Sequence, residues 1–167
     1  MAGMSDAIAT LFLEYSVTKL NKMEELLTTC VNKLSDEQVW RKRGDHENAI
    51  GNLILHLCGN MRQWILHGIA GHPDVRTRDE EFSAGGTLTG AQLLERFHTT
   101  ATEAKTVIAS LPAERLTDRI NPQHGEVAVL DAVYQVVSHV EGHVGQVILL
   151  TKQMLHRDLD LTLPRKR

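Results

Sequence analysis

Two histidines near the end of the chain, His139 and His143, have the type and spacing that most clearly suggest chemistry. They are four residues apart, so on a helix they project from one face, one turn from each other. A divalent metal accepts imidazole nitrogens at roughly 2.0–2.1 Å, and an i, i+4 pair on a helix supplies two such ligands. The alternative is a pair of buried histidines satisfied by hydrogen bonds, and this segment alone does not decide between the two.

The segment that carries both histidines, residues 129–155, contains no proline and is rich in apolar residues, which predicts one long helix. Its apolar residues occupy most of the helical circumference, and such a helix is typically buried. Gln135 and Gln146 lie within about 40° of His139 on the helical wheel. We therefore expect these polar side chains to line something inside the protein.

A second long helix is predicted from Asn48, its N-cap, to about Ala70, where a Gly–His–Pro sequence closes it. Apolar residues surround most of this helix as well. One polar stripe, spaced at helical intervals and about 60° wide, interrupts them. Its members are His56, Asn60, Gln63 and His67.

In a helical bundle, two polar stripes are most simply buried by facing each other, which brings His56 to His139 and His143. Three imidazoles with an open fourth position are typical of a catalytic zinc site, whereas a structural site normally has four protein ligands. His67 is about 16 Å further along the helix than His56, too far for the same ion. Asn60 and the three glutamines are candidates for pocket residues.

Two further long helices complete the predicted architecture. The first covers residues 5–34 with Ser5 as N-cap, and a capping box at residues 35–38 opens a short turn. Thr89 caps another helix that ends at Ser110, and turn signals at residues 113–127 indicate a hairpin or an irregular crossover. The inward face of the first helix is predicted to carry Ile8, Leu11, Phe12, Tyr15, Leu20, Met23, Leu27 and Val31.

These elements predict an all-α fold, a four-helix bundle with long crossover loops, as one domain over residues 1–167. The loop at residues 72–87 is long for a compact domain, which favours a functional or covering role. Its charged residues are expected to be solvated, although an arginine near an open metal site can hold an anionic substrate. The charges are Arg76, Arg78, Asp79 and Glu80. The histidines near element ends are also expected to be solvated: His46, His72, His98, His124 and His156.

Composition excludes several functional classes. The chain has 167 residues, 42% of them hydrophobic and 23% charged, and a formal net charge of −3. It lacks the basic excess of a nucleic-acid binder, and its 4% aromatic content argues against base stacking. We also expect no membrane span and no signal peptide. Cys30 and Cys58 fit two buried thiols in a reducing cytoplasm.

Three stretches carry a resemblance to a known family. LILHLCGNMRQWILHG at 53–68, followed by RTRDEEF at 76–82, is similar to the DinB-like superfamily of small bacterial metal-binding bundles. SHVEGHVGQV at 138–147 resembles the H-x-x-x-H motif in the last helix of that superfamily. The resemblance implies a four-helix bundle, often a homodimer, with His56, His139 and His143 as ligands of one divalent metal. Some members are transferases or isomerases that use a low-molecular-weight thiol such as bacillithiol or mycothiol, whereas the most similar subgroup has no assigned reaction.

Together these arguments predict a cytoplasmic metal-dependent enzyme acting on a small molecule, with one divalent ion, zinc or nickel being favoured. Two mechanisms fit, hydrolysis by an activated water or S-transfer by an activated thiol. The resemblance favours thiol transfer. The rival hypothesis is a non-catalytic dimeric bundle that binds a metal or a small ligand.

Overall fold

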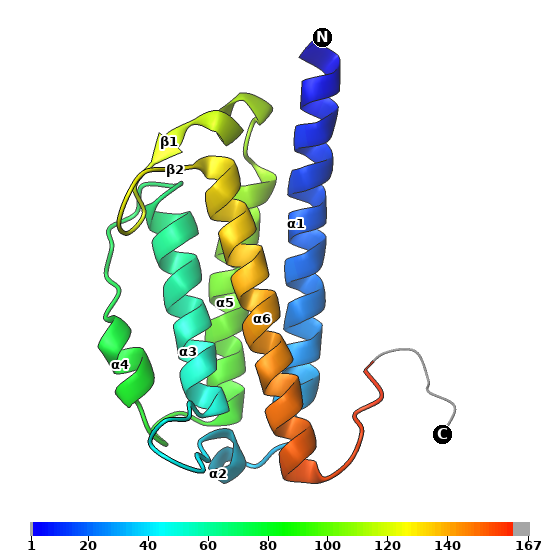
Figure 1. Ribbon diagram of the computed structural model, residues 1–167, viewed down its shortest axis with the longest axis vertical. Helices are drawn as coiled ribbons and strands as arrows, with labels where there is room; N and C mark the ends of the chain where they lie inside the picture. The colour runs from blue at the N-terminus through cyan, green and yellow to red at the C-terminus, as the bar shows by residue number, and fades with distance from the viewer. Residues whose placement is uncertain (1, 162–167) are drawn as a thin grey trace.

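Four long helices form a bundle in the computed structural model, which describes residues 2–161 (Figure 1). They are α1 (Ala2–Val31), α3 (Ile50–Met61), α5 (Gly90–Ala109) and α6 (Val129–Leu155). A π-helical segment, η1 (Arg62–His67), continues α3. The connections contain α2 (Asp36–Val39), α4 (Arg78–Ser83), the 3₁₀ turn η2 (Ala113–Thr117) and two short strands, β1 (Arg119–Ile120) and β2 (Val127–Ala128). The predicted four-helix bundle is confirmed.

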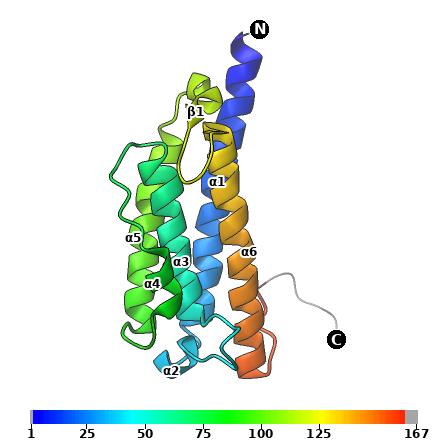
Figure 2. The same cartoon turned by 60° about the vertical axis from the view of Figure 1, so that its left-hand side comes forward.

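The order of the helices explains the long connections. α1 packs against α5 and α6, and α3 packs against the same two helices. α3 and α5 run in the same direction, so the chain must cross the length of the bundle between them (Figures 1 and 2). α4 lies on that crossover and packs on α3. β1 and β2 form an antiparallel hairpin in the connection between α5 and α6.

The core is apolar and drawn from all four long helices. Burying one large aliphatic or aromatic side chain contributes about 1.5–3 kcal/mol relative to leaving it exposed. The side chains exposed by no more than 1% include Leu20, Leu27, Ile54, Leu57, Phe97, Ile108, Val136 and Val140.

Helix ends follow the predicted signals in most places. Ser35 and Gln38 form the expected capping box of α2, and Thr89 and Gln92 form one at the start of α5. Gly71 has a φ of 76° just after η1, as a helix-closing glycine should. The prediction of Asn48 as N-cap is wrong by one residue. The N-cap is Ala49, whose backbone N–H donates to Oδ1 of Asn52 at 3.1 Å.

The start and the inward face of α1 differ from the prediction. The helix already begins at Ala2, so Ser5 is not its N-cap. Ile8, Leu11 and Tyr15 are 63–66% exposed, whereas Leu20, Met23 and Leu27 are buried as expected. At 100° per residue, the two sets lie on faces about 120° apart, so the predicted stripe combined two different faces.

Three other expectations also need correction. α6 spans the predicted residues, but it is not buried all round, because Leu130, Tyr134 and Leu149 are exposed. The loop at 72–87 contains a helical turn, α4, whose Glu81 is buried. The sequence after Arg157 predicts a loosely ordered tail, yet Leu159 packs against the core, and residues 162–167 lie outside the described residues. Within the described part of the chain, no helix is long and apolar enough to cross a membrane.

Candidate metal centre

Three histidines meet between α3 and α6. One nitrogen from each of His56, His139 and His143 lies within 4.8 Å of the others. His56 comes from the second long helix and is buried, whereas His139 and His143 are partly exposed neighbours on α6. The structure therefore brings together the three residues that the two polar stripes predicted to meet.

The spacing of the nitrogens suits a shared ion. Nε2 of His56 and Nε2 of His139 are 2.9 Å apart. Two nitrogens bound to one ion at 2.0–2.1 Å, with an angle of about 90–110° between them, lie about 2.9–3.4 Å apart. The rings also meet edge to face, with centroids 4.5–5.2 Å apart for the three pairs. The three imidazoles thus lie close together without stacking, and at least one pair of nitrogens already has the spacing of two ligands on one ion.

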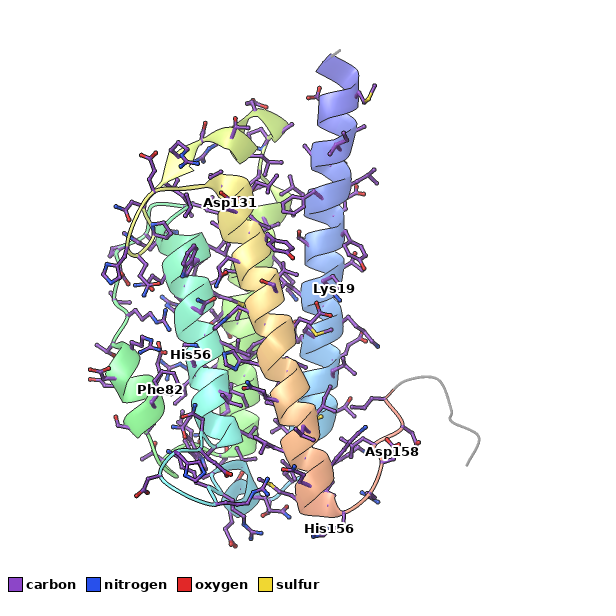
Figure 3. The ribbon with its side chains drawn as sticks, in the orientation of Figure 1. Lys19, His56, Phe82, Asp131, His156 and Asp158 are labelled. Atoms are coloured by element: carbon purple, nitrogen blue, oxygen red, sulfur yellow. The ribbon has the colours of Figure 1, made fainter. Side chains whose placement is uncertain are left out.

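Two of the three histidines, His143 and His56, have a hydrogen-bond partner at Nδ1. Nδ1 of His143 lies 2.8 Å from Oε1 of Gln146, one of the predicted pocket residues, so Nδ1 carries the proton and Nε2 is free. Nδ1 of His56 lies 2.9 Å from Oε2 of Glu81. Figure 3 shows His56 on α3 beside Phe82 of α4, the helix that supplies this carboxylate.

Burial and mutual repulsion keep the α6 histidines neutral. Burial, followed by the neighbouring His143 and His56, lowers the pKa of His139 to about 4. Burial likewise lowers the pKa of His143, against the opposing hydrogen bond to Gln146. Neutral imidazoles are the form that binds metal, so the pocket presents its donors ready for an ion near neutral pH.

Glu81 is the centre of a second cluster, which faces the Nδ1 side of His56. Arg76 donates from Nε to Oε1 at 2.8 Å and from Nη2 to Oε2 at 2.9 Å. Burial raises the pKa of Glu81, but the hydrogen bonds from His56 and Arg76 outweigh it, and the pKa of this carboxyl is lowered. Arg76 also donates to Gln63 at 2.9 Å, which accounts for that predicted pocket residue.

An aromatic side chain and an arginine border the site on the α4 side. The Phe82 ring lies 4.8 Å from the His56 ring, centroid to centroid. The guanidinium carbon of Arg78 sits 5.0 Å above the Phe82 ring, a cation–π arrangement. Phe82 therefore packs beside His56, and Arg78 covers the Phe82 ring.

The sequence matches a family model along almost its whole length. Residues 7–167 match the family described as "Protein of unknown function (DUF1572)". The chain belongs to the DUF1572 family. A search of curated proteins finds no match. Among solved structures, this DUF1572 chain is similar to a DinB-like protein from Bacillus cereus ATCC 10987, with a TM-score of 0.67 at 15% identity over 93% of this chain and 95% of that one. At that identity the likeness supports the fold alone, and the DinB-like fold predicted from sequence is confirmed.

The donor set of this DUF1572 chain fits a divalent metal. Three imidazoles, two of them with a hydrogen-bond acceptor at Nδ1, form a borderline-soft nitrogen site suited to zinc or nickel. Among the residues that the structure describes, no cysteine or carboxylate joins the three nitrogens. Asn60, one turn after His56, is 5% exposed, and its Oδ1 has no hydrogen-bond partner within the described residues. A buried acceptor in this state is available to a donor from outside the described residues.

The remaining predicted residues lie away from the convergence point. Gln135 is exposed on α6, so it does not line the interior. His67 bonds its own turn, with Nδ1 2.7 Å from the carbonyl oxygen of His72. The five other histidines are exposed, as expected. Cys58 is buried and its pKa is raised to about 12 by burial, which fits a core thiol rather than a nucleophile.

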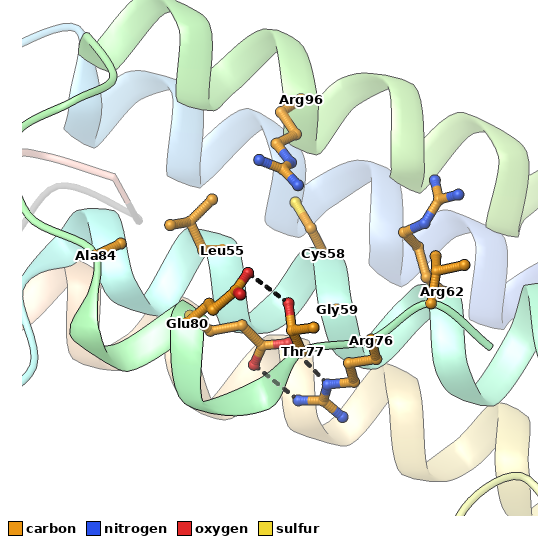
Figure 4. Close-up of a pocket in the computed structure, with 11 residues that line it drawn as sticks. Leu55, Cys58, Gly59, Arg62, Arg76, Thr77, Glu80, Ala84 and Arg96 are labelled. Carbon is orange, nitrogen blue, oxygen red and sulfur yellow. Dashed lines mark hydrogen bonds and ion pairs between the residues drawn. The ribbon is translucent and has the colours of Figure 1, made fainter.

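Sequence reasoning missed the functional setting of Glu81. Arg76 was expected to be solvated and Glu81 was not singled out, yet the side chains of Arg76 and Glu81 are 5% and 9% exposed. A cavity of about 280 Å³ between α3, α4 and α5 borders this ion pair on the side away from the three nitrogens, with Arg62 and Arg96 along it (Figure 4). The signal was available, because RTRDEEF was one of the stretches that carried the family resemblance.

Proposed function

We propose that this protein binds one divalent metal ion through His56, His139 and His143 and uses it as an enzyme on a small molecule. The observation that carries the proposal is the convergence of three imidazole nitrogens within 4.8 Å without a fourth protein ligand among the described residues. Three protein ligands and an open position are the pattern of catalytic rather than structural zinc sites. Zinc or nickel suits the donors best.

The chemistry follows from that open position. A divalent ion held by three imidazoles lowers the pKa of a water or a thiol placed beside it, which generates a nucleophile near neutral pH. We favour S-transfer with a low-molecular-weight thiol as co-substrate, with hydrolysis as the second possibility. The family resemblance supports this preference, and both reduced cysteines, Cys30 and Cys58, are consistent with action in the cytoplasm.

Three side chains would orient the substrate. Asn60 offers a buried acceptor oxygen to a donor group on the incoming molecule. Phe82 presents an apolar face next to His56, and Arg78, which lies over that ring, offers a cation to a negatively charged substituent. A small molecule with an apolar part and an anionic group matches this surface.

Cobalt substitution with an added thiol tests the open position. The protein is loaded with Co²⁺ and titrated with 2-mercaptoethanol while the absorption spectrum is recorded, beside the His67→Ala variant as a control on the same polar stripe. We expect a saturable sulfur-to-cobalt charge-transfer band in both proteins. One bound Co²⁺ per chain whose spectrum does not change at any thiol concentration would contradict the enzyme and support a closed, non-catalytic site.

We also propose that the protein is a homodimer, formed through an apolar surface on α1 and α6. We call this the α1–α6 surface: Met4, Ile8, Leu11, Tyr15, Leu130 and Tyr134, which are 40–73% exposed. An ion pair between Lys19 and Glu141 joins the two helices, which run in the same direction, so the apolar residues of both lie at about the same height (Figure 1).

A second copy of the chain is the partner that this surface fits. The α1 residues recur at intervals of four, three and four, the spacing of a coiled-coil seam, and such a seam packs best against another of its kind. Two identical seams related by a twofold axis form an isologous interface. Soluble monomers rarely leave a contiguous apolar patch of this kind exposed.

A further inference from the structure

The buried carboxylate of Glu81 is not one of the proposed metal ligands, yet it contacts one of them, His56, directly. We propose that Glu81 is the positioning residue of the centre: it holds the proton of His56 on Nδ1 and thereby leaves Nε2 free for the metal. The inference rests on the proposed function in one respect, that His56 is a metal ligand. The contact between Glu81 and His56 is present in the structure whether or not a metal binds.

The contacts favour one tautomer of His56. An ionised carboxylate can only accept hydrogen bonds, so the 2.9 Å contact between Oε2 and Nδ1 requires a proton on Nδ1. Nη2 of Arg76 also lies 3.1 Å from Nδ1, but this nitrogen donates to Oε2 at the shorter distance of 2.9 Å, so we assign the proton to Nδ1. A neutral imidazole with its proton on Nδ1 has its lone pair on Nε2. That nitrogen is the one that faces Nε2 of His139 at 2.9 Å. A carboxylate behind a ligating histidine also raises the basicity of the nitrogen that binds the metal.

Arg76 keeps the carboxylate charged and immobile. Its two hydrogen bonds to Glu81 are side by side, and its third nitrogen is bonded to Gln63. Burying such a charge pair costs desolvation energy that an apolar pair of the same size would not. Stability alone therefore does not explain the pair, whereas delivery of a charged acceptor to His56 does.

The backbone of the crossover is fastened so that Glu81 reaches His56. The side-chain nitrogen of Asn52 donates to the carbonyl oxygens of Glu81, Phe82 and Ala84, at 3.0, 3.3 and 2.8 Å. Asn52 lies one turn before His56 on α3, so the same helix holds both the ligand and the clamp.

Gly59 supplies the space that the carboxylate needs. A Cβ atom at this position would overlap Oε1 of Glu81 and lie 2.8 Å from its Cδ and 3.0 Å from Nε of Arg76. Figure 4 shows Gly59 directly beside the Arg76 ion pair. The position thus requires a residue without a side chain for the pair to form as it does.

Metal affinity is the first readout. The dissociation constant for Zn²⁺ is measured by chelator competition in the wild type, Glu81→Ala, Glu81→Gln and Glu80→Gln. Losing an outer-sphere partner typically weakens metal binding about 10–100-fold, which we expect for Glu81→Ala. Glu81→Gln keeps a neutral acceptor and should lose less. Glu80→Gln is the matched control and should bind as the wild type does, because Glu80 bonds Thr77 rather than a histidine.

The tautomer of His56 is the second readout, and it needs no metal. Long-range ¹H–¹⁵N spectra of the metal-free wild type should show His56 protonated on Nδ1, and Glu81→Ala should move the proton wholly or partly to Nε2. Gly59→Ala, which displaces the carboxylate, should act in the same direction if Glu81→Ala does not fold.

The two readouts separate the two proposals. A wild type with His56 protonated on Nε2, or a Glu81→Ala variant with wild-type affinity and tautomer, would overturn the role of Glu81. A wild type that binds no metal but shows the expected change of tautomer would overturn the proposed function and leave the positioning role in place.

Discussion

Two regions of the molecule break the rule that apolar side chains are buried and polar ones exposed, and they break it in opposite ways. They are the interior between α3 and α6 and the outer face of α1. Between α3 and α6, imidazoles, a carboxylate and a guanidinium are buried where apolar residues are the norm. On α1, Ile8, Leu11 and Tyr15 are exposed where polar residues are the norm. Buried polar groups and exposed apolar patches are the informative exceptions in a folded protein.

The two exceptions differ in what they still need. The interior groups already form a connected network from Gln63 through Arg76 and Glu81 to His56 and His139. We propose that a small ion completes this network. The α1–α6 surface presents exposed apolar side chains, which we propose are covered by a second copy of the chain. Our proposals therefore assign the chemistry to one side of the molecule and the assembly to the other.

The largest effect is expected from breaking the interior. His139→Ala removes one of three proposed ligands, so metal binding should weaken by more than the ~100-fold that the loss of an outer-sphere partner can cause. Zn²⁺ affinity is measured by chelator competition, with His67→Ala as a control. Equal losses in the two variants would contradict a site that consists of the three histidine ligands.

Breaking the outer face should change assembly and leave the metal site intact. Leu11→Glu places a charge in the proposed seam and should weaken the dimer at least about tenfold, which corresponds to about 1.4 kcal/mol. Sedimentation velocity over a concentration series measures this, beside Leu149→Glu, an equally apolar and exposed position outside the surface. A wild type that remains monomeric at high concentration would contradict the homodimer.

Mild acid should destabilise the metal-free protein through the interior. The pKa of His139 is lowered to about 4, whereas the unfolded chain binds this proton near the ordinary value of 6.5. The unfolded state therefore binds more protons below 6.5, and stability should fall as the pH drops from 6.5 towards 4.

Urea unfolding in chelator at several pH values between 7.5 and 5 measures this slope. In this pH range Glu24 and Glu81, whose pKa values are lowered, are ionised in the folded protein and largely ionised in the unfolded chain. They therefore contribute little to the slope. His139→Gln should reduce the slope and leave the contribution of His143, whose pKa is also lowered. An unchanged slope would place the titrating group elsewhere.

The smallest effect concerns the unpaired oxygen of Asn60. In metal-free protein, replacing Asn60 by Leu removes a buried acceptor without a partner, whose burial costs about 1–3 kcal/mol. We expect the free energy of unfolding to stay level or rise by about 1 kcal/mol. A loss of several kcal/mol, measured by urea unfolding, would mean that Oδ1 is already satisfied and is not available to a ligand.

Sequence periodicity predicted the interior site better than its surroundings. The residue range of α6 followed from a proline-free, apolar-rich segment. The meeting of His56 with His139 and His143 followed from two polar stripes, because a bundle has few ways to bury them. α4 is only six residues long, which is too short for a periodic pattern, and the burial of Glu81 depends on long-range contacts with Asn52 and Gly59.

The outer face was misjudged for a different reason. Ile8, Leu11 and Tyr15 form a regular apolar stripe, and a sequence pattern does not distinguish a stripe that faces the core from one that faces a partner. Gln135 shows the same limit in reverse, because it is near His139 on the helical wheel and yet exposed. Angular position on a helix predicts neighbours only where the direction of the core is known.

Elemental analysis of the purified, untagged protein tests the central claim most directly, with the triple variant His56→Ala/His139→Ala/His143→Ala beside it. The account predicts about one divalent metal ion per wild-type chain and none in the variant. Absence of metal from the wild type, even after incubation with Zn²⁺ or Ni²⁺ and removal of excess, would contradict the metal centre and the enzyme built on it.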